Sequence, residues 1–220
     1  MDHGSKKVQT WTARRRSLQH TPHTAVLRES PLLPGLFKTI HLAYLTSDQK
    51  SFGTSAGDRL RSIDDLILVL RNDPDSFIIV LSQSDPDGEI LSTASCRRYY
   101  GPDRDTSKPW ACTHHPAPGV DEWELKMVAT HPSAQGKGLA SYMLGLAEEE
   151  VIRRSLVKAT DTAQSRTKMI MCIPETTFAE FYARRGYVKD YTRPFRDTST
   201  TFNINFISKI LELKNSGDTR

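Results

Sequence analysis

The fold is decided by residues 128–140, which read VATHPSAQGKGLA. The first three residues end an apolar stretch, beginning at Trp123, that is typical of a β-strand, and Leu139 opens a segment with apolar residues at helical spacing. Gly136 and Gly138 allow the chain to curl between strand and helix, so that several main-chain N–H groups converge at the helix N-terminus. Such a loop predicts a binding site for phosphate or pyrophosphate.

Other phosphate-binding loops fit this stretch poorly. The pattern GxxxxGK followed by Ser or Thr is absent, and Ser141 stands where the dinucleotide pattern GxGxxG needs its third glycine. Lys137 adds a positive charge at the rim of the loop, and Gln135 can donate an amide hydrogen bond. The alternative is a glycine-rich turn that only starts a helix.

The hexad at 135–140, QGKGLA, resembles the Q/R-x-x-G-x-G/A signature of the GNAT acetyltransferases. Its place between a strand and an amphipathic helix agrees with that family, and residues 181–187, FYARRGY, resemble the family's FYxxxGF element. The detailed resemblance covers residues 122–188. It implies an α+β protein with the GNAT fold, in which one central mixed β-sheet of about six or seven strands is splayed at its middle strands and flanked by about four helices.

The resemblance implies acetyl-CoA as the co-substrate and no metal. In this family the strand before the loop hydrogen-bonds the pantetheine arm through its main chain, much as an added strand would, and the loop holds the pyrophosphate. The residues implied to bind the cofactor are Val128, Ala129, Thr130, Gln135, Gly136, Lys137, Gly138, Leu139 and Ala140. The N–H of Val128 is also the expected contact for the oxyanion of the tetrahedral intermediate.

The resemblance further implies direct transfer of the acetyl group to a primary amine in a ternary complex. An amine with a pKa of roughly 10.4 must lose a proton before it attacks. Glu124 has the spacing to Gln135 at which the histone-acetyltransferase branch keeps its catalytic glutamate, and Glu122 lies on the same strand face as a reserve. Tyr182 matches the tyrosine that protonates the departing thiolate. The alternative is that both glutamates face solvent and that Tyr182 only packs.

Local patterns predict the remaining elements. Strands are expected at 37–44, 77–81, 90–96, 123–130, 168–173, 187–192 and 202–210. Helices are expected at 62–70, from 139 onward, and between 177 and 186, with a loop or short helix at 46–57. A tight turn at 85–88 joins two of the strands into a hairpin, and the aperiodic segment 99–120 is expected to be a long loop that borders the acceptor site.

Length and charge predict one domain. At 220 residues the chain suits a single domain at 35–212, between a basic, flexible tail at 1–34 and a short tail at 213–220. Six basic and two acidic residues lie within 1–34, and the remaining basic and acidic residues cancel. A neutral body argues against a nucleic-acid-binding domain. The expected partner is a small-molecule amine, with no nucleic acid or membrane, in a monomer or homodimer.

The expected location is the cytoplasm. No apolar run reaches the roughly 18 residues of a membrane span, and the N-terminus lacks the apolar centre of a secretory signal. Cys96, Cys112 and Cys172 are odd in number and widely spaced, which suits a reducing compartment. The basic, acid-poor start of the chain leaves a mitochondrial transit peptide as the minor alternative.

Several rival functions stay open. Cys112, His114 and His115 are candidate metal ligands without an evident fourth partner, and Cys172 is a candidate nucleophile in an apolar strand. A catalytically silent CoA-binding module would keep the same scaffold. Within the enzyme hypothesis, the acceptor could also be a protein lysine or N-terminus instead of a small molecule.

Overall fold

The computed structural model describes most of the predicted domain. The described residues are 16–17, 29–52, 60–70, 73, 75–83, 88–105, 108, 110–159, 166–176, 178–196 and 201–213. Most of the two predicted tails, and the centre of the predicted turn at 85–88, lie outside them.

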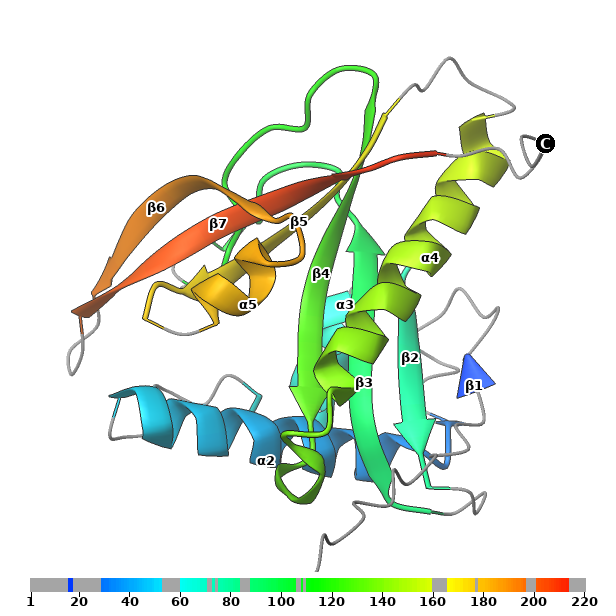
Figure 1. Cartoon of the computed structure of the whole chain (residues 1–220), viewed down its shortest axis with the longest axis vertical. Coiled ribbons are helices and arrows are strands. Elements are labelled where there is room, and N and C mark those ends of the chain that lie inside the picture. Colours follow the sequence, from blue (N-terminus) through cyan, green and yellow to red (C-terminus); the bar gives the residue numbers. More distant parts are fainter. Residues whose placement is uncertain are drawn as a thin grey trace, which may run out of the picture.

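A mixed sheet forms the centre of the molecule (Figure 1). Across the sheet, the strands follow the order β1 (Arg16–Ser17), β2 (Phe77–Ser82), β3 (Ile90–Arg98), β4 (Val120–Thr130), β5 (Arg166–Pro174), β7 (Thr201–Leu211) and β6 (Val188–Arg196). β4 and β5 run parallel, and the other described neighbours are antiparallel. The predicted α+β class with one mixed sheet is confirmed.

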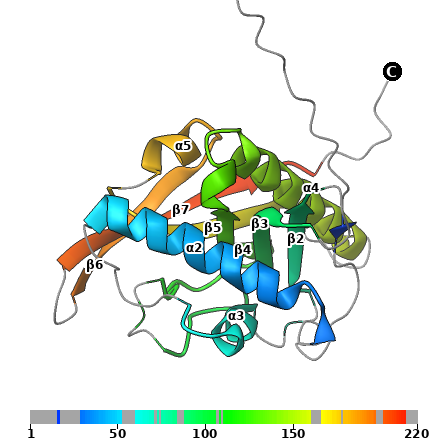
Figure 2. The same ribbon diagram turned by 90° about the horizontal axis from the view of Figure 1, so that it is seen from below.

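Helices cover both faces of this sheet (Figure 2). They are α2 (Leu33–Phe52), α3 (Ile63–Leu70), α4 (Leu139–Ala159) and α5 (Ala179–Ala183), with a short 3-10 turn, η1 (Pro132–Ala134), before α4. α4 packs its buried Met143 against Trp123 and Leu125 on one face. α2 and α3 cover Met127 and Ala129 on the other.

The predicted strand at 37–44 is wrong, because these residues lie inside α2. Leu33, Leu36, Ile40 and Ala43 are buried and recur every three or four residues, which is the period of a helix. Pro34 sits in the first turn of α2, where a missing N–H costs no hydrogen bond. The predicted domain start at 35 therefore falls within α2.

The middle of the sheet is splayed. Pairing between β4 and β5 runs from Val120 opposite Arg166 to Glu124 opposite Ile170 and stops there, although both strands continue. On its other edge β4 stays paired with β3, where Lys126 is an extra residue between two consecutive pairs. This bulge turns the second half of β4 away from β5. The predicted splay of the middle strands is confirmed.

Trp123 fixes α4 to the paired half of β4. Its side chain is fully buried, and its indole N–H donates to Asp121 Oδ2 at 2.9 Å and to Ser155 Oγ of α4 at 3.1 Å. The Ser155 hydroxyl in turn donates to the same carboxylate at 2.7 Å. A buried polar network of this kind sets one position for the helix along the strand.

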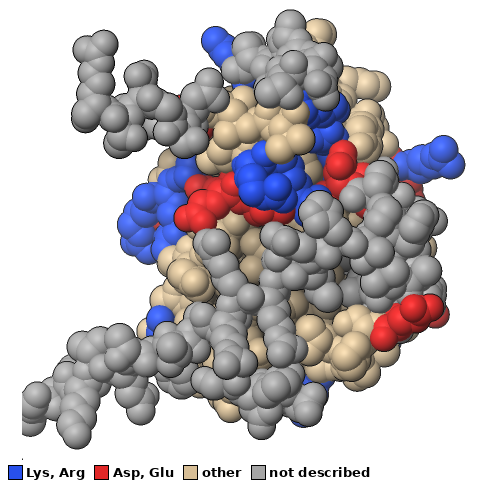
Figure 3. All heavy atoms as spheres, turned by 90° about the vertical axis from the view of Figure 1, so that its right-hand side faces the viewer, with Lys and Arg blue, Asp and Glu red and all other residues tan. Residues whose placement is uncertain are grey.

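The outer face of α4 is charged but mixed in sign. Glu150 forms ion pairs with Arg153 and Arg154 along the helix. In Figure 3, basic and acidic side chains lie together in a band across the visible face. None of the described helices combines the length and apolar character that crossing a membrane requires.

We expect Leu36→Ala to lower the free energy of unfolding by about 2–5 kcal/mol, because a fully buried leucine of α2 would leave a cavity. Leu68→Ala is the control, since Leu68 of α3 is 69% exposed, and it should change stability by less than about 0.5 kcal/mol. Urea denaturation followed by circular dichroism measures both. Equal stability of the two variants would contradict the packing of α2 in the core.

Candidate active site

A cavity of about 600 Å³ opens where β4 and β5 separate. The second half of β4 and the end of β5 form two of its walls, and the loop before α4 forms a third. α2, α5, Val69 of α3, Leu60 before it and Trp110 of the long loop between β3 and β4 also contribute to the lining. Trp110 belongs to the long loop that the sequence predicted to border the acceptor site.

The loop between β4 and α4 has the backbone conformation of an anion-binding turn. Gly136 and Gly138 have φ angles of 76° and 78°, which side-chain-bearing residues rarely adopt. A Cβ atom at either glycine would meet no other atom within 4 Å, so the space beside the loop is open. The first hydrogen bond of α4 runs from the Tyr142 amide to Gly138 O at 3.1 Å. The amide N–H groups of the first helical turn therefore lie at the cavity and have no carbonyl partner within the helix.

The splayed part of β4 presents its main chain to the gap. The amide of His131 donates to Leu91 O of β3 at 2.9 Å. Because successive residues of a strand direct their main-chain groups to opposite edges, those of Val128 and Thr130 face away from β3. The Gln135 side chain donates to Thr130 O at 3.3 Å and so connects the loop to the strand. An extended ligand in the gap can pair with β4 as a further strand would.

Arg185 joins the two segments that carry the sequence motifs. From the end of α5 its guanidinium donates to the hydroxyl of Ser141 in the first turn of α4 and to Phe181 O at 2.7 Å. It also lies over the Phe181 ring, with Cζ at 3.7 Å from the centroid. This contact adds a positive charge near the N-terminus of α4.

Nearly all of the residues expected to bind the cofactor line the cavity. Those that do are Val128, Ala129, Thr130, Gln135, Gly136, Gly138, Leu139 and Ala140. Lys137 belongs to the same loop but is not part of the lining. The structure therefore brings together the strand and loop segments that the sequence predicted to work together.

Tyr182 lies on the cavity wall in α5. Its side chain is 8% exposed and packs edge-on against the rings of Phe181 and Tyr187. Burial, with a smaller contribution from Tyr44, raises the pKa of the Tyr182 phenol above its ordinary value. The phenol is therefore protonated at neutral pH and can donate a hydrogen bond into the cavity.

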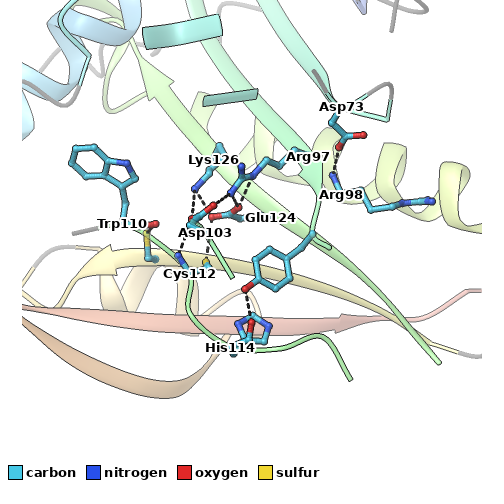
Figure 4. Close-up of polar contacts among 11 residues, drawn as sticks. Asp73, Arg97, Arg98, Asp103, Trp110, Cys112, His114, Glu124 and Lys126 are labelled. Carbon is cyan, nitrogen blue, oxygen red and sulfur yellow. Dashed lines mark hydrogen bonds and ion pairs between the residues drawn. The ribbon is translucent and has the colours of Figure 1, made fainter. Parts of the chain in front are cut away.

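Glu124 lies beneath the cavity and does not line it. Its side chain is 1% exposed. Arg97 Nε donates to Oε2 at 2.7 Å, and Lys126 Nζ and Cys112 Sγ contact Oε1 at 2.5 and 3.3 Å. Figure 4 shows Lys126 and Arg97 directed toward Glu124 and Asp103. Both carboxylate oxygens of Glu124 are therefore already engaged.

Lys126 is the member of this cluster that reaches the cavity. Burial, the largest single effect, would lower the pKa of its ammonium, but the nearby negative groups, Glu124 foremost and Asp103 with it, together outweigh burial and the pKa is raised. Asp103, in the long loop, has a pKa that burial would raise but that Lys126 and Arg97 hold below its ordinary value. Lys126 and Asp103 are therefore both charged at neutral pH.

The reserve base and the rival sites are occupied by other contacts. Glu122 is buried, with one oxygen at 2.7 Å from His114 Nε2 and the other accepting from the Ala117 amide at 3.1 Å. Among the described residues, no group of three or more His, Cys, Asp or Glu could hold a metal ion. The thiol of Cys172, on the cavity wall, contacts Trp110 O at 3.4 Å.

The sequence comparison decides the family. The model of the Acetyltransferase (GNAT) family matches residues 39–187, more than half of the chain. The chain belongs to the GNAT family. It is therefore an acetyltransferase that uses acetyl-CoA. Among curated proteins, none matches it in sequence.

Solved GNAT structures share this fold. The ribosomal-protein-S18-alanine N-acetyltransferase of Escherichia coli is similar with a TM-score of 0.55 at 12% identity, over 94% of this chain and 98% of that chain. A GNAT acetyltransferase of Streptococcus pneumoniae is similar with a TM-score of 0.53 at 10% identity, over 90% and 99% of the two chains. At such identities the likeness shows the fold alone.

Sequence reasoning missed several residues that line the cavity. Tyr44 and Ser47 were missed because α2 was predicted to be a strand followed by a loop. Lys126 was overlooked although a lysine inside an otherwise apolar half-strand is a visible signal. Lys126 and Arg97 both pair with Glu124, but Arg97 lies far away in sequence, and no local pattern joins the two cations.

We expect Gly138→Val to weaken CoA binding by at least about 10-fold, because a β-branched residue at this positive φ costs roughly 1–2 kcal/mol and its side chain enters the open space beside the loop. Gly145→Ala is the matched control, since Gly145 lies within α4, has an ordinary φ and has room for a Cβ. Isothermal titration calorimetry with CoA measures both. Equal affinity of the two variants would overturn the assignment of the loop.

Proposed function

We propose that the protein is an N-acetyltransferase that moves the acetyl group of acetyl-CoA to the primary amine of a small molecule. One observation carries this proposal: the glycine loop, the splayed half of β4 and Tyr182 line the same cavity as α2 and Trp110. Donor and acceptor can then be bound together. The wall formed by α2 and Trp110 favours a small acceptor over a protein surface.

The reaction is a direct attack in a ternary complex. The pyrophosphate of CoA lies at the loop containing Gly136 and Gly138, and the pantetheine arm pairs with the main chain at Val128. The neutral amine attacks the thioester carbonyl, a C–N bond forms and the C–S bond breaks. The Val128 N–H stabilises the oxyanion of the intermediate. One amine proton leaves the nitrogen, and the CoA thiolate ends as the thiol.

Tyr182 assists the leaving group. A CoA thiol has a pKa of roughly 8.5, lower than that of the phenol, so complete proton transfer from Tyr182 is unfavourable. A hydrogen bond from the phenol to sulfur as negative charge develops is the help that this geometry supports. Its position on the cavity wall and its protonated state support this role.

Glu124 is the proposed base, and it accepts the amine proton through water and not by direct contact. Its oxygens are engaged by Arg97, Lys126 and Cys112, so the amine proton reaches it only through water that enters the cluster beside Lys126. Glu122 stays the reserve, held by His114. Neither glutamate lines the cavity, so substitution of each in turn is needed to separate their roles.

Two other functions use the same cavity. The Escherichia coli neighbour is named for the N-acetylation of an alanine of ribosomal protein S18, which favours an amine of a protein as the second candidate. A silent CoA-binding module would retain the loop without transfer. To separate them, the protein is incubated with acetyl-CoA and either small amines or peptides, and free thiol is measured. Thiol release with small amines supports the proposal, release with peptides alone supports the second candidate, and CoA binding without release supports the silent module.

We expect Tyr182→Phe to lower kcat by about 10- to 100-fold while leaving the Kd of acetyl-CoA unchanged, because only the hydrogen bond to the leaving sulfur is lost. Tyr100→Phe is the control, since Tyr100 is 66% exposed and is not part of the cavity lining. The initial rate of thiol release at saturating substrate gives kcat, and isothermal titration calorimetry gives the Kd of acetyl-CoA. If kcat is unchanged in the Tyr182 variant, its role is packing.

We expect Glu124→Gln to lower kcat by about 100-fold, because the amine then lacks its proton acceptor. Glu122→Gln is matched to it, as a buried glutamate on the same strand with its own partners. Circular dichroism and CoA binding establish that each variant is folded. The opposite ranking would assign the base to Glu122, and near-wild-type rates in both would make the two residues structural.

A further inference from the structure

Lys126 is the one charged side chain in the cavity lining among the residues that the structure describes. The rest of the acceptor side is largely apolar, with Leu60, Val69, Trp110 and Met127 among its members. A charge in such surroundings has a larger effect than it would on the surface, because little water is present to screen it. The lysine is therefore the strongest electrostatic feature that an acceptor would meet.

The ammonium of Lys126 has hydrogen-bonding capacity left over. It carries three N–H donors, and its contact with Glu124 Oε1 at 2.5 Å uses one of them. Asp103 Oδ2 lies at 4.0 Å, beyond hydrogen-bonding distance. The side chain is 8% exposed, so the remaining donors have little access to bulk water and their open side is the cavity. Buried donors of this kind require an acceptor oxygen.

The position of Lys126 is fixed from two sides. It is the bulged residue of β4, directly before the splay, and its ion-pair partner Glu124 is held in place by Arg97. Lys126 also precedes Val128 by two residues, a rise of roughly 7 Å along a strand. A group bound at the ammonium and an amine beside Val128 therefore lie within the dimensions of one small molecule.

We propose that Lys126 binds a carboxylate of the acceptor, so that the substrates are amino acids or similar amines with an acid group close to the amine and an apolar body. This inference rests on the proposed function and names the acceptor class for the same site. A simple alkylammonium would meet the lysine cation and find no oxygen acceptor for its charge there. Because Glu124 and Asp103 balance Lys126 and Arg97, recognition depends on the directed N–H donors and not on a bare excess of charge.

The alternative role for Lys126 is contact with the oxygen of the thioester. In that case the lysine would accelerate transfer to every amine alike, with or without an acid group. Acceptor recognition instead predicts an effect confined to acid-bearing amines. The two roles therefore differ in selectivity and not only in rate.

The test begins with the wild-type protein and matched acceptors. Apolar L-amino acids are compared with their carboxamides and with the amines that lack the acid group, and thiol release from acetyl-CoA gives kcat/KM. The carboxamides carry less basic amines that lose a proton more easily, so intrinsic reactivity works against the expected result. We expect the acids to be favoured by about 10- to 100-fold, as for a hydrogen bond to a charged group. Equal rates, or a preference for the other amines, would overturn the inference.

Variants then assign any preference to the lysine. Lys126→Met should reduce kcat/KM for the acids to that for the other amines and leave the Kd of acetyl-CoA unchanged. Lys168→Met is the matched control, because Lys168 lies on β5, pairs with Asp190 at 3.2 Å and does not line the cavity. A uniform loss for all acceptors in the Lys126 variant would contradict the inference, because it would assign the lysine to the thioester or to the positioning of Glu124. Transfer to the amines without an acid group, but not to the amino acids, would contradict this inference and leave the proposed function standing. Binding of CoA without transfer to any amine would contradict the proposed function as well.

Discussion

Main-chain pairing between β4 and β5 ends at Glu124 and Ile170, and the site depends on this interruption. Two parallel strands that separate expose N–H and C=O groups along their facing edges, and such groups need partners. The bulge at Lys126 allows β4 to leave β5 while it remains hydrogen-bonded to β3. Around the gap, α4 is held to the paired half of β4 through Trp123 and Ser155. The hydrogen bonds of β4 with β3 and the contacts of β4 with α4 thus hold the strands in place on either side of the gap.

Local signals in the sequence predicted the elements on the donor side. Residues close together in sequence specify the glycine conformation at Gly136 and Gly138, the strand before the loop and the helix after it. The family resemblance then predicts that these elements bind CoA. The strand prediction at 37–44 was wrong for a reason that is also local. Its alternating apolar residues overlap a helical repeat, and only burial of Leu36 and Ile40 against the sheet distinguishes the two.

The proposed acceptor side could not be predicted in this way, because distant segments build it. Glu124 has the expected spacing from the loop, but its environment comes from Arg97 on β3 and Cys112 in the long loop. Those contacts enclose the carboxylate of Glu124, and Lys126 lines the cavity where Glu124 does not. A strand pattern shows which residues share a face, and it does not show which partners the other strands and loops bring to them.

The interruption in the sheet also links ligand occupancy to folding. A pantetheine arm that pairs with Val128 would take the place of the strand contact that β5 withdraws, so the cofactor completes the sheet of the folded chain and has no equivalent site in the unfolded one. Mass action then adds to the stability of the native state, by about 2.7 kcal/mol when free acetyl-CoA is at 100 times its Kd. The lifetime of this protein in a cell would accordingly follow the supply of its own donor.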